Sequence, residues 1–129
     1  MIYTDEQLIE KIKQMIITFE DEVVEFKEAR TSYSFKDIGK YFSALGNEAN
    51  IRGKKEAWLI FGVDNKKNIL GTAYRQDGNL QNLKKEIVGG TNERATFMEI
   101  YDLKIDNHRI VAFQIPPAIP GIVTTWHGA

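Results

Sequence analysis

Hydrophobic residues in the first part of the chain recur at helical spacing, and then at strand spacing. Across residues 5–17, apolar positions three and four apart fall on one helix face: Leu8, Ile9, Ile12, Met15 and Ile16. Thr4 is the expected N-cap, and Asp5 and Glu6 follow in the first turn, where the helix dipole favours acidic side chains. This pattern predicts an amphipathic helix.

The next two segments predict a strand and a second helix. Residues 22–28 alternate from Val24 onward, with Val24 and Phe26 on one face and Glu25 and Lys27 on the other, which is typical of a strand. A second amphipathic helix follows, capped by Ser34. Its apolar stripe consists of Ile38, Tyr41, Phe42 and Leu45.

The second half of the chain reads as two hairpins separated by a helix. Residues 57–63 (AWLIFGV) are continuously apolar, as expected for a strand covered on both faces. Together with the turn DNKKN and the segment ILGTAY, they predict a hairpin over residues 57–74. A third helix ends at Gly89 and Gly90, and residues 95–116 alternate as a final hairpin.

The element order αβαββαββ predicts the α+β class, with three helices packed on a mixed sheet of about five to six strands. A length of 129 residues with 43% apolar side chains suits one domain, residues 1–129. The ending IPPAIPGIVTTWHGA is typical of a linker, so we expect the N-terminal part of a longer protein. Trp126 in this ending is expected to be open to a partner.

Composition excludes several classes of site. The absence of cysteine excludes disulfides and thiolate zinc sites, and fits a reducing cytoplasm. No apolar run reaches the roughly 18 residues of a membrane span. His108 and His127 are too few and too far apart for a histidine metal site. With a net charge of −1, nucleic-acid binding would need a local basic surface.

Two loops carry local positive charge. Arg52, Lys54 and Lys55 follow the second predicted helix, and Lys66 and Lys67 lie in the turn after the AWLIFGV strand. If both loops lie at one end of the sheet, these cations could meet a phosphate backbone together. Ordinary solvated loops have the same composition, so both interpretations stay open.

Four short motifs, taken in order, resemble the divergent Alba-like module of the Schlafen family. They are EFK at residues 25–27, SALGN at 43–47, FGVD at 61–64 and ILG at 69–71. Each motif alone is weak, whereas their order and spacing are specific. The resemblance extends over roughly residues 18–127.

The resemblance implies a cytoplasmic, nucleic-acid-binding domain of a bacterial transcriptional regulator or helicase-related protein. Binding DNA or RNA through the basic loops would require no cofactor. A C-terminal domain of the full-length protein is an expected partner. A homodimer is also expected, because Alba-like modules often pair and the final segment would need cover.

The resemblance also implies an alternative function. Nuclease members of the family cleave RNA at a metal-dependent site of three acidic residues, which match Glu20, Glu25 and Asp64 here, with Lys27 in support. Converging carboxylates repel one another unless a cation such as Mg²⁺ or Mn²⁺ neutralises them, and that cation can polarise a phosphodiester. A solvated strand face and a turn-starting aspartate explain the same residues. A third possibility is a protein-interaction module that docks through its tail.

Overall fold

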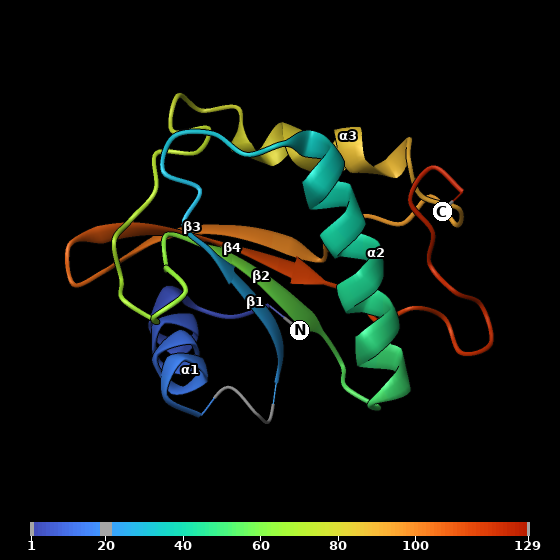
Figure 1. Ribbon diagram of the computed structural model, residues 1–129, viewed down its shortest axis with the longest axis horizontal. Helices are drawn as coiled ribbons and strands as arrows, with labels where there is room; N and C mark the ends of the chain where they lie inside the picture. The colour runs from blue at the N-terminus through green and yellow to red at the C-terminus, as the bar shows by residue number, and fades with distance from the viewer. Residues whose placement is uncertain (1, 19–21, 129) are drawn as a thin grey trace.

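A single mixed sheet organises the chain in the computed structural model, which describes residues 2–18 and 22–128. Its described strands run in the order β1-β2-β4-β3, with β1 parallel to β2 and the other neighbours antiparallel (Figure 1). The strands are β1 (Val23–Lys27), β2 (Ala57–Phe61), β3 (Glu99–Ile105) and β4 (His108–Ile115).

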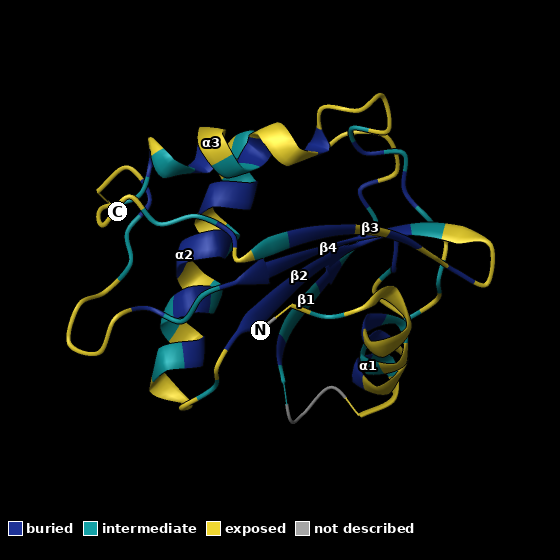
Figure 2. Cartoon of the chain, turned by 180° about the vertical axis from the view of Figure 1, so that it is seen from behind, coloured by how far each residue is buried: buried dark blue, intermediate teal, exposed yellow. Residues whose placement is uncertain are grey.

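Helices cover both faces of this sheet. α1 (Asp5–Thr18) lies on one face, and α2 (Phe35–Ile51) and α3 (Leu83–Val88) lie on the other (Figures 1 and 2). A short 3₁₀ turn, η2 (Leu80–Asn82), leads into α3. The α+β class and the three predicted helices are therefore confirmed.

Local capping explains where the two long helices begin. Thr4 and Gln7 form a capping box, in which Thr4 Oγ1 accepts from the Gln7 backbone N–H and Gln7 Oε1 accepts from the Thr4 N–H. Ser34 Oγ accepts from the Asp37 N–H at 3.4 Å at the start of α2. Both predicted N-caps are confirmed.

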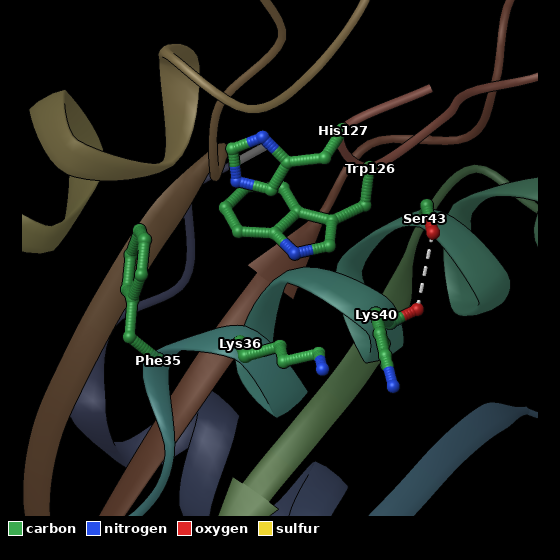
Figure 3. Close-up of a pocket in the computed structure, with 6 residues that line it drawn as sticks. All are labelled: Phe35, Lys36, Lys40, Ser43, Trp126 and His127. Atoms are coloured by element: carbon green, nitrogen blue, oxygen red, sulfur yellow. Dashed lines mark hydrogen bonds between the residues drawn. The ribbon is translucent and has the colours of Figure 1, made fainter. Parts of the chain in front are cut away.

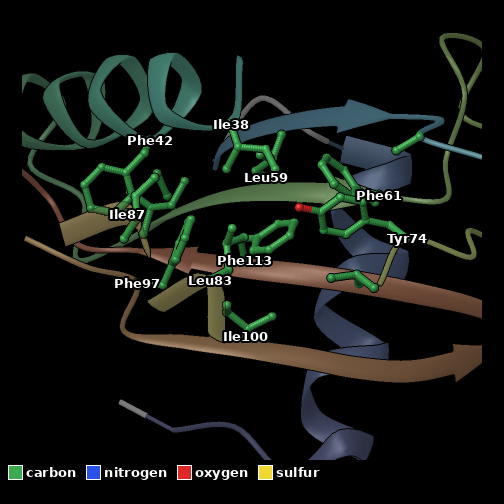
Figure 4. Packing of buried hydrophobic residues seen from close by; sticks show 14 of the residues in the cluster. Ile38, Phe42, Leu59, Phe61, Tyr74, Leu83, Ile87, Phe97, Ile100 and Phe113 are labelled. Carbon is green, nitrogen blue, oxygen red and sulfur yellow. The ribbon is translucent and has the colours of Figure 1, made fainter. Parts of the chain in front are cut away.

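All five residues of β2 are buried, because each face of the sheet carries its own apolar layer. On the α2 side, aromatic rings interlock, with the Phe61 and Phe113 centroids 5.0 Å apart (Figure 4). On the α1 side, Ile12 packs with Trp58 and Ile60. The predicted double-sided burial of the AWLIFGV strand is confirmed.

The predicted count of five to six strands is wrong, because the described sheet has four. The segment ILGTAY makes only one bridge of the expected hairpin, Ile69 to Val63. Both edges of β2 are already occupied, by β1 and by β4, so no edge remains for ILGTAY to pair with. Instead its Thr72 and Ala73 N–H groups donate to the backbone carbonyls of Arg109 and Arg30.

The expectation that Trp126 is open to a partner is also wrong. Its side chain belongs to the core cluster on the α2 side and is only 5% exposed. The tail folds back over the domain, and a backbone bridge joins Trp126 to Thr91. The indole ring lies against Gly39 of α2 and Gly90 after α3, where a Cβ atom would be 2.0 or 2.2 Å from it.

None of the described helices combines the length and apolarity that crossing a bilayer requires.

Candidate functional site

β1 is an edge strand that presents Glu25 and Lys27 on the face toward α2. The Glu25 side chain is 40% exposed, and its Oε2 lies 3.5 Å from Lys27 Nζ. Lys27 also lies 5.0 Å from the centre of the Tyr41 ring. The pKa of Lys27 is raised, first by its hydrogen bond with Tyr41 and further by the charge of Glu25. Lys27 is therefore a cation that partly neutralises Glu25.

Asp64 begins the turn after β2. Its Oδ1 accepts from the backbone N–H groups of Lys66 at 2.9 Å and Asn68 at 2.8 Å, and its Oδ2 accepts from Asn68 Nδ2 at 3.2 Å. These donors, led by the Asn68 N–H, lower the pKa of the carboxyl group. Asp64 therefore has the structural role of a turn-starting aspartate.

The predicted set of three carboxylates is only partly placed. Glu20 lies outside the described residues. Glu25 lies opposite Leu59 in the strand register, whereas Asp64 lies beyond the end of β2. Among residues 2–18 and 22–128, no three His, Cys, Asp or Glu side chains gather as a metal site would require. Because Glu20, one of the three predicted ligands, is not among the described residues, the structure does not test a site for Mg²⁺ or Mn²⁺, and the nuclease site stays a prediction.

The two basic loops lie at opposite ends of β2. Arg52, Lys54 and Lys55 precede this strand, and Lys66 and Lys67 follow it. A strand of five residues spans about 16 Å, so the condition for one continuous five-cation surface is not met. The chain presents two separate basic groups.

The two groups differ in their surroundings. Lys54 and Lys55 line a cavity of about 260 Å³ together with Lys11 and Glu56. Lys66 is exposed beside Asp64. In the same turn, Lys67 Nζ lies 5.2 Å from the centre of the Phe26 ring of β1.

Sequence reasoning missed a buried carboxylate at the start of β2. Glu56 is 7% exposed and accepts from Trp58 Nε1 at 3.2 Å, from Gln114 Nε2 at 2.9 Å and from the Tyr3 hydroxyl. Burial, and then the hydrogen bond to Glu56, raises the pKa of Tyr3. The one signal in the sequence was an acidic residue directly before an apolar strand. The network ties the N-terminal segment to the sheet.

Sequence reasoning also missed a pocket between α2 and the tail. Its volume is about 620 Å³ (Figure 3). The lining residues are Phe35, Lys36, Lys40, Ser43, Trp126 and His127. No local pattern could have revealed it, because the pocket exists only when the tail returns to α2.

Two asparagines hold the tail that forms this pocket. Asn47 Nδ2 donates to the Thr124 carbonyl at 2.9 Å, and Asn47 Oδ1 accepts from the Thr124 N–H at 2.7 Å. Asn92 makes the same paired contact with the Val123 carbonyl and the Thr125 N–H. Each side-chain amide therefore binds the tail as a neighbouring strand would, and the pocket wall is fixed.

Comparison with solved structures shows the same fold in two bacterial proteins. The DIP2311 protein from Corynebacterium diphtheriae matches with a TM-score of 0.54 and 18% identity, over 95% of this chain. The chain spans only 24% of that protein. The N-terminal domain of a protein from Nitrosomonas europaea, named as related to the ATP-dependent DNA helicase RecG, also matches with a TM-score of 0.54. There the identity is 16%, covering 87% of this chain and 74% of that one.

No curated protein matches the sequence significantly. The family described as Schlafen, AlbA_2 matches residues 20–127, which leaves only α1 and a few terminal residues outside. The resemblance inferred from the EFK, SALGN, FGVD and ILG motifs is confirmed. Because the match covers most of the sequence, the chain belongs to the Schlafen, AlbA_2 family.

Proposed function

We propose that this domain binds nucleic acid through backbone phosphates, with its two basic loops as separate contacts. The observation that carries the proposal is the family match, together with the cations that flank β2, of which Arg52, Lys55 and Lys66 are exposed. The name of the Nitrosomonas protein, which relates it to a DNA helicase, supports a nucleic-acid-associated role. In the cell, we propose, the domain is the N-terminal, cytoplasmic module of a longer transcriptional regulator.

The distance between the loops favours a polymer as the ligand. Lys54 and Lys66 flank a strand of about 16 Å, so a single phosphate cannot reach both. Each strand of duplex DNA carries one phosphate per about 3.4 Å of helix axis, so roughly five of them cover that distance along the axis. Lysine contacts to phosphates position a nucleic acid without reading its bases. We therefore expect binding with little sequence preference.

Salt dependence of binding tests this proposal. Fluorescence anisotropy with labelled single-stranded DNA, duplex DNA and RNA would give the affinity at several salt concentrations. Each lost contact should reduce the slope of log affinity against log salt by about 0.9 for duplex DNA and about 0.7 for single strands. We expect this reduction for Lys54→Ser with Lys55→Ser, and for Lys66→Ser with Lys67→Ser.

Lys85 provides the matched control, because it is an exposed lysine on α3, away from both loops. Lys85→Ser should leave the salt slope unchanged. Binding that does not depend on salt, or loop variants with the wild-type slope, would contradict the proposal. Comparison of the three labelled ligands identifies which nucleic acid is preferred.

A further inference from the structure

The pocket between α2 and the tail combines aromatic walls with a cationic rim. The Phe35 and Trp126 rings meet edge to face with centroids 5.3 Å apart, and the His127 ring lies 4.5 Å from that of Trp126. A volume of about 620 Å³ is in the range of small-molecule sites. The walls suit a flat, apolar ring.

Inside this pocket, one buried polar group lacks a partner. Trp126 is 5% exposed, and among the described residues its Nε1 has no acceptor. An indole N–H can only donate, and buried donors in folded proteins almost always have an acceptor. Figure 3 shows this nitrogen on the ring edge that faces α2, on the side of Lys36 and Lys40. The donor is therefore turned toward the cationic rim.

The rim itself consists of Lys36 and Lys40, one helical turn apart on α2. Both are exposed, and among the described residues neither has an ion pair, unlike Lys11, Lys27 and Lys84. Two cations at this spacing attract an anionic group with more than one oxygen, such as a phosphate. Tyr41 of α2, which contacts Lys27 of β1, does not line the pocket, so the pocket is separate from the Glu25 face.

We propose that this pocket binds a nucleotide, with the base against Phe35 and Trp126 and the phosphate between Lys36 and Lys40. A base supplies both the flat ring for the aromatic walls and an acceptor for the Trp126 N–H. A simple anion can accept from the indole donor but leaves the aromatic walls without a ring to pack on, and a neutral ring would leave the two lysines unused. The ligand is either a free nucleotide or one unstacked nucleotide of a nucleic acid, and the second case rests on the proposed function.

Nuclear magnetic resonance of the indole groups tests the inference directly. The chain has two tryptophans, so a ¹H–¹⁵N spectrum contains two indole signals. Adenosine 5′-monophosphate should move the Trp126 signal. Trp58 is the internal reference, because it is fully buried in the core and its Nε1 already donates to Glu56.

Two further probes and one pair of variants separate the contributions. Adenosine, which lacks the phosphate, should bind more weakly, and inorganic phosphate should move the Trp126 signal less than the monophosphate does. Lys36→Ser with Lys40→Ser should weaken binding of the monophosphate by about tenfold or more and leave adenosine unaffected. Lys85→Ser is again the matched control. The Trp58 signal reports whether each variant is folded.

Each outcome decides the inference. It is overturned if millimolar adenosine 5′-monophosphate moves neither indole signal, or if inorganic phosphate reproduces the whole effect. A short single-stranded oligonucleotide that moves the Trp126 signal identifies a nucleotide of a polymer, and the monophosphate alone identifies a free nucleotide. If an oligonucleotide binds through the basic loops while the Trp126 signal stays fixed with every probe, the proposed function stands and this inference fails.

Discussion

The structure supports a role for Asp64 in stabilising its turn more directly than a role in metal binding or catalysis. Three donors hold its oxygens, and its pKa lies below the ordinary aspartate value of about 3.9. A depressed pKa adds stability at pH values above the ordinary pKa, and this stability is lost as the pH falls through the lower value of the folded state. The role observed for Asp64 therefore predicts a defined acid sensitivity.

Replacement of Asp64 by asparagine tests that role. Asp64→Asn keeps an oxygen that can accept the backbone N–H groups but no longer titrates. Thermal unfolding followed between about pH 5 and pH 2 should show a weaker loss of stability than in the wild type. Asp77→Asn, at an exposed aspartate for which the described residues show no such donors, should keep the wild-type pH dependence. An identical pH dependence in Asp64→Asn and the wild type would contradict this account.

The adjacent glycines 89 and 90 allow a matched test of the packing around Trp126, because only Gly90 lies against the indole ring. A Cβ atom at Gly90 would lie 2.2 Å from the indole ring, whereas at Gly89 the nearest atom is 3.8 Å away. Gly90→Ala should therefore lower the free energy of unfolding by about 1–3 kcal/mol through overpacking. Gly89→Ala should be neutral or stabilising by up to about 1 kcal/mol, because Gly89 has helical backbone angles. Urea denaturation measures both, and equal effects would exclude contact with the ring as the cause.

At the scale of elements, α1 packs on one face of the sheet and supplies part of one of the two hydrophobic cores. The family match nevertheless begins only at residue 20, after this helix. Ile12 is fully buried against the sheet, whereas Ile17 on the same helix is 70% exposed. Ile12→Ala should cost about 2–5 kcal/mol in unfolding free energy, and Ile17→Ala should stay within about 0.5 kcal/mol. Chemical denaturation of the two variants measures this difference. Equal stabilities would mean that α1 does not stabilise the sheet.

The elements that sequence reasoning predicted correctly are those with local signals. The helices at Asp5–Thr18 and Phe35–Ile51 carry their own apolar spacing and their own caps, so their prediction needed no knowledge of the rest of the chain. ILGTAY has the composition of a strand, but whether it pairs depends on which strands already flank β2. That information lies in β1 and β4, each more than 30 residues from ILGTAY along the chain, and no local pattern contains it.

At the scale of the whole molecule, the same limit applies to the candidate sites. The basic loops were recognised from composition, but their placement at opposite ends of β2 follows only from the strand between them. Trp126 was misjudged because proline-rich chain predicts an extended tail, while its burial depends on contacts from Asn47 and Asn92. These asparagines had no pattern that linked them to the tail. The homodimer expected from an uncovered tail stays a prediction, because the domain covers the Trp126 side chain but leaves Ile119, Ile122 and Val123 of the tail exposed.

The packing of Trp126 against two glycines constrains which residues relatives in the family can have at these positions. Two glycines far apart in the sequence, Gly39 and Gly90, leave room for one indole ring, so the three positions share a single volume. A relative with a larger side chain at either glycine can keep this tail only if its counterpart of Trp126 is smaller. Across an alignment, these positions should therefore change together, with side-chain size exchanged between them. Relatives that lack both the glycines and the tryptophan should also lack the pocket that the returning tail encloses.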